Sequence, residues 1–429
     1  MPPRYALLVV GLAVASLSID AFVLQPQSAL TRVTCRTGSQ RATRAVQPLR
    51  SENVGAAAED AADKTAAAVD SALKQGSEKV EAAAKDAAQR TAEAAGAAGD
   101  AADDVMDAAK EGAKEVTLAA KDRVSLGGVE VSPLGVGAWA WGDTLFWGYS
   151  EAMDKELQEV FGNCVGGGVN LFDTAEVYGL GRSEYLCGKF RRDYKGADKD
   201  GIVIASKFAP LPWRLGRRSV VDACKASLDR MGAESMEIYQ IHWPFGAMNS
   251  RYWDGLADCV DQGLVKAVGV SNYGPEAVKE AHAALKARGV QLGSNQIQFS
   301  LVNRKPETSG MLKLCEDLDV RVLAYSPLAQ GLLTGKYSKD FVPSGPRGRV
   351  FKKKLAKTES LLAKLKEIGG TRDKTPAQVS LNWCITKGTI PIPGAKNIRQ
   401  ADENCEALGW RLSKEEMSAL DSAAAAAGL

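Results

Sequence analysis

The sequence predicts an α/β fold, a (β/α)8 TIM barrel that occupies residues 123–429. Eight short runs rich in apolar and β-branched residues recur along this region, and segments with the apolar periodicity of helices lie between them. The region is about 300 residues long, which suits one barrel of eight strand–helix units. A doubly wound sheet alternates in a similar way but rarely needs eight regular units. A single barrel therefore explains the pattern best.

The predicted elements follow in order along the chain. A short hairpin, roughly residues 124–133, is expected first and would close the bottom of the barrel. Helices are predicted between the strands, for example over residues 219–232 and 375–388. The second of these starts with Thr375 as N-cap and Pro376 at the first helical position. The eight candidate strands are residues 134–139, 168–174, 202–208, 236–243, 265–272, 294–300, 320–327 and 389–395.

Two glycine motifs have a partial likeness to nucleotide-binding signatures. The GVGAWA run at residues 135–140 has the spacing of a dinucleotide fingerprint, which should end a strand and open a helix. Trp, Gly and Asp follow at residues 141–143 with no helical face, so we interpret the run as the first barrel strand and its loop. Residues 331–336 have the wrong spacing for a phosphate-binding P-loop.

Composition excludes several classes of protein. The 429 residues are 45% hydrophobic and 25% charged, and the net charge of +2 gives no basic field for nucleic acid. The eight cysteines form no C-x-x-C pair, which favours free thiols in a reducing compartment. With only two histidines, His242 and His282, no metal site is expected. No coiled-coil seam is evident, and although the oligomeric state stays open, a monomer is the favoured state.

The first 54 residues have the composition of targeting signals. Residues 1–21 combine Arg4, an apolar stretch and small residues up to Ala21, which is typical of a signal peptide too short for a lasting membrane anchor. Residues 22–54 are rich in Arg, Ser and Thr, with no acidic residue before residue 51, as in a transit peptide. Together they resemble the bipartite plastid-targeting leaders of algae with secondary plastids. A secretory leader followed by a linker is the alternative.

Residues 55–122 form a low-complexity segment of Ala, Lys, Asp and Glu. Alanine favours helix, but the segment has no stripe of large apolar residues with which to build a core. We interpret it as a solvated helix or a disordered linker. The alternative is a helix that lies on a membrane or on a partner.

Polar residues stand where three successive apolar strand runs end. Asp173 and Tyr178 follow the second strand, Lys207 ends the third and His242 ends the fourth. Buried Asp and Lys side chains should pair with each other, because either charge alone would be costly there. A tyrosine beside that lysine is expected to have a lowered pKa and to act as a general acid, while His242 polarises a carbonyl. Each residue alone has a structural explanation, but the four together favour catalysis.

Dense local matches identify the chain as similar to a known family. Over residues 124–420 it resembles the aldo-keto reductase superfamily, and within it the plastid-type reductases of plants and algae. The matching stretches include LGVGAWAWGD, FDTAEVYG, SKFAPLPWR, YQIHWP, SNQIQFSLVNR, AYSPLAQGLLTGKY and IPIPGAKN. The resemblance implies a barrel of the aldo-keto reductase type, and it assigns the four catalytic positions to Asp173, Tyr178, Lys207 and His242.

The same resemblance implies that NADPH binds extended across the barrel mouth. It assigns the nicotinamide end to Ser271, Asn272, Gln296 and the ring of Tyr325. It assigns the pyrophosphate to Ser326, Leu328 and Gly331, and the adenosine end to Gly394, Lys396, Asn397, Gln400, Glu403 and Asn404. Lys396, with Arg399, would hold the 2′-phosphate that distinguishes NADPH from NADH. Ala395 and Gln400 differ from the residues that many relatives carry there, which keeps NAD open as the alternative cofactor.

The implied reaction is reduction of a small-molecule carbonyl compound to an alcohol. Trp141, Trp213 and Trp243 lie near predicted strand ends, so an aromatic substrate pocket is expected. A pyridoxal reductase of the same superfamily is the alternative among enzymes. An NADPH-binding, redox-sensing regulatory subunit is the alternative outside them, although the leader and the Ala-rich segment are not typical of such a subunit. In a third interpretation the Ala-rich segment protects or tethers, while the barrel reduces carbonyl products of stress.

Overall fold

The computed structural model describes residues 122–144, 146–337, 341–342 and 346–428. Asp122 is the first residue described, so the predictions for residues 1–21 and 22–54, and for all of the segment 55–122 except Asp122, lie outside the described residues.

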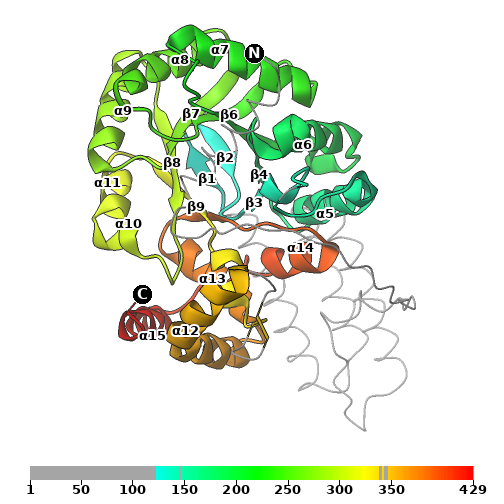
Figure 1. Cartoon of the computed structure of the whole chain (residues 1–429), viewed down its shortest axis with the longest axis vertical. Coiled ribbons are helices and arrows are strands. Elements are labelled where there is room, and N and C mark those ends of the chain that lie inside the picture. The colour runs from blue at the N-terminus through cyan, green and yellow to red at the C-terminus, as the bar shows by residue number, and fades with distance from the viewer. Residues whose placement is uncertain (1–121, 145, 338–340, 343–345, 429) are drawn as a thin grey trace, which may run out of the picture. The chain divides into compact units, whose positions relative to one another are not determined.

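Eight parallel strands form a single sheet in which each strand pairs with the next along the chain (Figure 1). The first and last strands also meet, because the Gly137 N–H donates to the Pro393 carbonyl at 2.9 Å. Every strand overlaps its predicted segment, so the predicted barrel is confirmed. The strands are β3 (Gly135–Gly137), β4 (Leu171–Asp173), β5 (Val203–Phe208), β6 (Met236–Ile241), β7 (Val265–Ser271), β8 (Leu292–Gln298), β9 (Arg321–Tyr325) and β10 (Ile390–Ile392).

The GVG run owes its glycines to the closure of the barrel. Strand β3 passes directly into a 3-10 turn at Ala138–Ala140, and the first α-helix after it begins only at Asp154. A Cβ on Gly137 would lie 2.9 Å from the Ile392 carbonyl oxygen, so a side chain there would force β3 away from β10. The run is therefore a barrel strand, as predicted, and not a dinucleotide fingerprint.

Helices surround the sheet (Figure 1). Their apolar faces pack on the strands, as where the ring of Phe161 stacks on Phe172 with 4.1 Å between centroids. The predicted start of α13 is confirmed: the Thr375 side chain accepts the Gln378 N–H, and the Gln378 side chain accepts the Thr375 N–H. The helices are α5 (Asp154–Gly166), α6 (Arg182–Asp193), α7 (Arg217–Met231), α8 (Asn249–Asp261), α9 (Pro275–Ala287), α10 (Lys305–Thr308), α11 (Met311–Asp317), α12 (Pro346–Thr371), α13 (Pro376–Thr386), α14 (Ile398–Cys405) and α15 (Lys414–Ala426).

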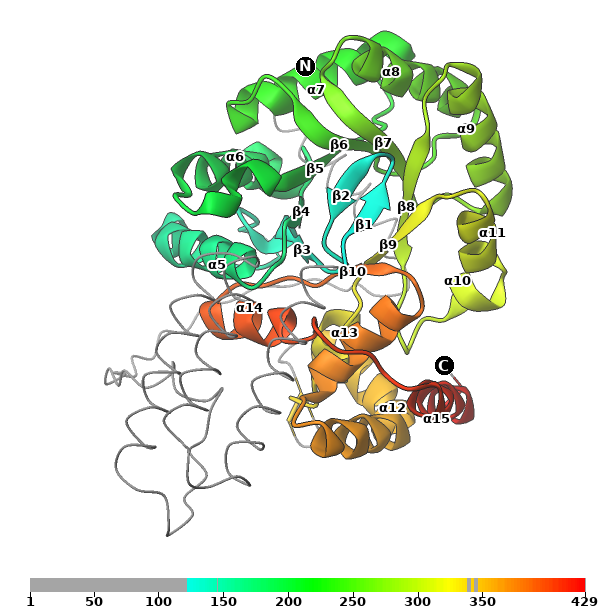
Figure 2. The ribbon, with the colours of Figure 1, turned by 180° about the vertical axis from the view of Figure 1, so that it is seen from behind.

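The predicted hairpin closes one end of the barrel. Strand β1 (Val124–Leu126) pairs antiparallel with β2 (Val129–Val131), and Figure 2 shows the pair lying across the centre of the strands. Leu126 and Val131 are fully buried, and they belong to one apolar cluster with Leu171, Val203, Ala205, Ile238, Ala267, Leu323, Ile390 and Ile392 of the barrel strands. Apolar side chains therefore fill the end of the barrel that the hairpin covers. A functional site is expected at the opposite end, where the carboxyl ends of the strands lie.

Three further observations concern the described residues only. None of their helices has the length and apolar character needed to cross a membrane. No three of their His, Cys, Asp or Glu side chains gather closely enough to hold a metal ion. Their cysteines are free thiols, and all but Cys405 are buried.

Candidate active site

A cavity of about 1380 Å³ opens at the carboxyl ends of the strands. Its walls come from the ends of β3, β4 and β6 to β10 and from the loops that follow them. It thus lies at the end of the barrel away from the hairpin, where barrel enzymes carry their chemistry. The volume exceeds the range of about 300–1000 Å³ typical of small-molecule pockets, so one long ligand and a second small one can fit together.

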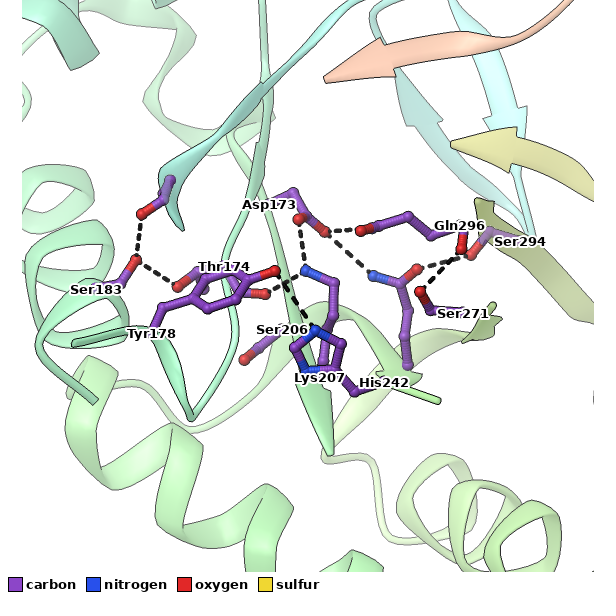
Figure 3. A network of polar contacts seen from close by, with 12 residues as sticks. Asp173, Thr174, Tyr178, Ser183, Ser206, Lys207, His242, Ser271, Ser294 and Gln296 are labelled. Atoms are coloured by element: carbon purple, nitrogen blue, oxygen red, sulfur yellow. Dashed lines mark hydrogen bonds and ion pairs between the residues drawn. The ribbon is translucent and has the colours of Figure 1, made fainter. Parts of the chain in front are cut away.

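A buried ion pair, Lys207 with Asp173, adjoins this cavity, whose wall includes Asp173; Figure 3 shows the pair. The Lys207 Nζ donates to Asp173 Oδ2 at 2.5 Å and to the Thr174 carbonyl at 2.8 Å. Asp173 Oδ1 accepts from the amide groups of Gln296 at 2.7 Å and Gln240 at 3.3 Å. The two charged side chains are 0% and 3% exposed, so each depends on these partners for its charge. The predicted pairing of Asp173 with Lys207 is confirmed.

Tyr178 reaches the same point from the loop after β4. Its hydroxyl lies 3.5 Å from His242 Nε2, and the Lys207 Nζ lies 5.0 Å from the centre of its ring. The chain turns sharply after it, with Gly179 at φ 55° packed so closely on the Gly142 carbonyl that no side chain would fit there. The structure thus brings all four predicted catalytic residues together, as Figure 3 shows.

His242 is held by its backbone and presents one ring nitrogen to the cavity. Its backbone N–H donates to the Phe208 carbonyl at 2.9 Å, and its Nε2 faces Tyr178. Nδ1 is buried and has no hydrogen-bond partner among the described residues. Because a buried N–H without an acceptor is costly, the neutral ring is expected to carry its proton on Nε2. There the proton can be donated to the oxygen of a ligand.

Burial sets the protonation states of these groups. Burial, followed by the negative charge of Asp173, raises the pKa of Tyr178 well above its usual value. Burial and then the positive charge of Lys207 lower the pKa of His242 well below its usual value. Burial also lowers the pKa of Lys207, although Asp173 opposes that change. The prediction that Lys207 lowers the pKa of Tyr178 is therefore wrong, because Asp173 takes up the lysine charge and the phenol is desolvated.

The residues assigned to the nicotinamide end of the cofactor lie beside the four candidate catalytic residues. Ser271, Asn272, Gln296 and Tyr325 all line the cavity. The Tyr325 hydroxyl donates to Asn272 Oδ1 at 3.0 Å, and the Ser271 hydroxyl donates to the Gln296 carbonyl at 2.8 Å. Asn272 has a left-handed φ of 60°, a conformation often found at binding sites. The Gln296 amide is bound to Asp173, so it joins this wall to the ion pair, a second role that the sequence did not indicate.

The other assigned residues, with one exception, line the part of the cavity that is formed by the loops after β9 and β10, which we call its long arm. Ser326, Leu328 and Gly331 follow β9 there, and Gly394, Lys396, Arg399, Gln400, Glu403 and Asn404 follow β10. Lys336 lies in the same wall and was not predicted. Asn397 is not part of the wall: its Oδ1 caps α14 by accepting the Gln400 N–H at 3.0 Å. Asn397 therefore caps a helix in the structure, and its assignment to a ligand stays a prediction.

Only one of the three predicted tryptophans lies in the aromatic part of the cavity wall. Trp243 does line the cavity, but Trp141 is fully buried and its indole N–H donates to the Ala395 carbonyl at 2.8 Å. Trp213 is 56% exposed and also lies outside the cavity wall. The wall instead carries Trp139, Phe146 and Trp147. Trp139 and Trp141 are two residues apart, and the 3-10 turn between them decides which one faces the cavity.

Comparisons with known proteins agree with this geometry. Residues 133–425 match the family model described as the aldo/keto reductase family. A chloroplastic pyridoxal reductase of Arabidopsis thaliana is 46% identical over 312 residues, which cover 70% of this chain and 86% of the relative. An uncharacterised oxidoreductase of Mycobacterium tuberculosis is 38% identical over 307 residues, or 69% of this chain and 90% of the relative.

Two solved structures share the architecture. A thermostable aldo-keto reductase in complex with the inhibitor epalrestat superposes with a TM-score of 0.58 at 28% identity, covering 70% of this chain and 99% of that one. An aldo-keto reductase from Klebsiella pneumoniae in complex with NADPH gives a TM-score of 0.56 at 26% identity, covering 70% of this chain and 94% of that one.

Proposed function

Because the chain belongs to the aldo/keto reductase family, we propose that it reduces an aldehyde or ketone to an alcohol with NADPH, using Tyr178 as the proton donor. One observation carries the proposal: the Tyr178 hydroxyl and His242 Nε2 converge at 3.5 Å on the cavity, beside the buried pair of Lys207 and Asp173. Two hydrogen-bond donors aimed at one point suit an oxygen on which negative charge develops.

Each of these residues has a distinct part in the proposed reaction. Bound NADPH supplies a hydride to the carbonyl carbon. His242, neutral and protonated on Nε2, donates a hydrogen bond that polarises the carbonyl oxygen. Tyr178 then gives its proton to that oxygen as general acid. Lys207 holds a positive charge beside the phenolate that is left, and Asp173 fixes the lysine in place.

The cavity fits the proposed cofactor by its volume and by its charge. Lys336, Lys396 and Arg399 all lie on the arm that follows β9 and β10, where the phosphates of an extended dinucleotide would need cations. At the other end Asn272 and Gln296 offer amide groups to a carboxamide, next to the ring of Tyr325. The cations thus suit the phosphate groups of NADPH, and the neutral amides suit its nicotinamide carboxamide.

Lys396→Met is expected to raise the KM for NADPH about tenfold and to change the KM for NADH less than twofold. The substitution removes the cation proposed to hold the 2′-phosphate, but it keeps most of the length with which Lys396 lies over the Trp147 ring, 5.1 Å from its centre. Steady-state kinetics with both cofactors measure this. An equal rise for NADH would place Lys396 elsewhere on the cofactor.

The pKa shifts predict a reduction rate that is flat through neutral pH. A raised pKa keeps Tyr178 protonated up to at least its usual value of about 10, and a lowered pKa keeps His242 neutral down to below about 6.5. The acid is thus lost only when the pH rises through the pKa of Tyr178. We expect kcat/KM at saturating NADPH to vary less than about twofold between pH 6.5 and 9. A steep fall between pH 7 and 8 would contradict this assignment.

The alternative activity, reduction of pyridoxal, is favoured by the 46% identity to the chloroplastic pyridoxal reductase. NADPH oxidation by the purified full chain, followed with pyridoxal, a nitrobenzaldehyde and short aliphatic aldehydes, distinguishes the possibilities. A strong preference for pyridoxal identifies that activity, and broad turnover identifies a general carbonyl reductase. Tight NADPH binding without turnover on any aldehyde would favour the redox-sensing subunit instead.

We also propose a plastid location, with residues 1–21 and 22–54 as the two parts of the leader. The composition of these residues supports it, as does the chloroplastic name of the Arabidopsis relative. Microscopy of residues 1–54 fused to a fluorescent protein tests the proposal, and secretion of the fusion would support the alternative.

A further inference from the structure

Charge is distributed unevenly along the cavity. The cations in its wall, Lys336, Lys396 and Arg399, all lie on the arm after β9 and β10. Around Tyr178 the wall comes from the loops after β3, β4 and β6, and its described residues include no Lys or Arg. Two carboxylates lie there, and the charge of Asp173 is balanced by Lys207. The unbalanced charge at the catalytic end is therefore that of Asp143.

Asp143 is fixed in a loop that packs against the turn directly after the proposed proton donor, Tyr178. Its Oδ1 accepts the Phe146 N–H at 2.9 Å, and its carbonyl accepts the Tyr149 N–H at 3.1 Å. The preceding residue, Gly142, packs on Gly179 directly after Tyr178. The residue is 9% exposed and forms part of the cavity wall. Oδ1 is thus engaged in a turn, while no described residue donates a hydrogen bond to Oδ2, so this oxygen can meet a ligand.

Aromatic rings surround the same part of the wall. The ring of Trp139 lies 5.6 Å from that of Trp147, 5.9 Å from that of Phe146 and 6.1 Å from that of Tyr178. The Lys396 Nζ already lies 5.1 Å from the centre of the Trp147 ring, so this wall attracts a cation in the structure as it stands. Aromatic faces combined with a carboxylate form the type of site that binds organic cations.

We propose that the catalytic end selects carbonyl compounds whose ring carries a positive charge or none over those that carry an anionic group, and that Asp143 is the residue that discriminates between them. The inference rests on the proposed carbonyl reductase function and names its substrate class. Protonated pyridines and quaternary ammonium aldehydes would pair with Asp143 and with the rings. A carboxylate or phosphate ester on the substrate would meet that negative charge, and the described wall residues from the loops after β3, β4 and β6 offer no Lys or Arg to offset it.

Three para-substituted benzaldehydes of similar shape test the proposal, bearing a trimethylammonium, a methyl or a carboxylate group. Asp143→Asn keeps an oxygen that can accept the Phe146 N–H and removes only the charge. We expect it to lower the ratio of kcat/KM for the cationic aldehyde to that for the anionic aldehyde about tenfold at saturating NADPH. Dividing the variant's ratio by the wild-type ratio cancels the intrinsic reactivity of each aldehyde.

Glu151→Gln is the matched control. It removes one negative charge eight residues further along the chain, but Glu151 is 84% exposed and lies outside the cavity wall, so the ratio should stay at the wild-type value. A tenfold fall in Asp143→Asn alone supports the proposal. The same ratio in Asp143→Asn and wild type, or an equal fall in both variants, overturns it.

Two further outcomes separate this inference from the proposed function. If the wild-type enzyme reduces none of the three aldehydes, nor any other carbonyl, the proposed function fails as well. If the Asp143→Asn variant reduces none of the three aldehydes, the effect of the Asp143 charge can still be tested in the wild-type enzyme by varying the salt concentration. Added salt should then lower kcat/KM for the cationic aldehyde and raise it for the anionic one, relative to the neutral one. Equal salt effects on all three would overturn the inference.

Discussion

Tyr178→Phe is expected to lower kcat for carbonyl reduction about a thousandfold, because general acid catalysis contributes on the order of 10²–10⁴ in rate. The phenylalanine ring can keep the contacts of the tyrosine, with Trp139 at 6.1 Å between centroids and the Lys207 Nζ at 5.0 Å from the ring centre. Only the hydroxyl that faces His242 is lost. NADPH affinity should therefore stay within about twofold of wild type, since the residues proposed to bind the cofactor are untouched.

Single-turnover reduction and a fluorescence titration with NADPH measure the two effects separately. Tyr185→Phe is the matched control, because Tyr185 is 40% exposed and lies outside the cavity wall. It should keep wild-type turnover. Turnover near the wild-type rate in Tyr178→Phe would show that another group supplies the proton.

Lys207→Met is expected to lower both stability and turnover. It leaves the carboxylate of Asp173 buried with only the amide groups of Gln296 and Gln240 as donors. Breaking a buried pair from one side costs about 3–5 kcal/mol, so the free energy of unfolding should fall by that amount. Turnover should fall as well, because the positive charge beside the Tyr178 phenolate is gone.

The double variant Asp173→Asn with Lys207→Met separates the two effects. It removes the isolated charge and keeps a side chain that can accept from Gln296, so much of the lost stability should return. Turnover should stay low, because the lysine charge is still missing. Denaturant unfolding and kcat on the same preparations measure this. Recovery of turnover together with stability would mean that the pair only supports the fold.

Much of the fold follows from local sequence pattern. The strand runs and the helix caps are local features, and each of the eight strands lies within about three residues of where its apolar run predicts it. The proposed catalytic residues could be found in the same way, because the carboxyl ends of parallel strands meet at one end of a barrel. Asp173, Lys207 and His242 needed no knowledge of distances to be placed together.

Three features needed the tertiary structure. Whether Trp139 or Trp141 faces the cavity depends on the short turn at Ala138–Ala140, since neighbouring positions on a turn point in different directions. Gln296 joins the cavity wall to Asp173 across 123 positions of sequence. The charge of Asp143 matters only because the described cations of the cavity lie on its other arm.

The sequence by itself therefore determined the barrel, its closing hairpin and which residues form the proposed catalytic group, because strand order and local periodicity fix which residues stand at strand ends. The tertiary structure alone decided the direction of the Tyr178 pKa shift. A pKa depends on how far the surrounding charges lie and how much water is excluded. At 2.5 Å the Lys207 charge is balanced by Asp173, so burial and the carboxylate outweigh the lysine and the phenol keeps its proton.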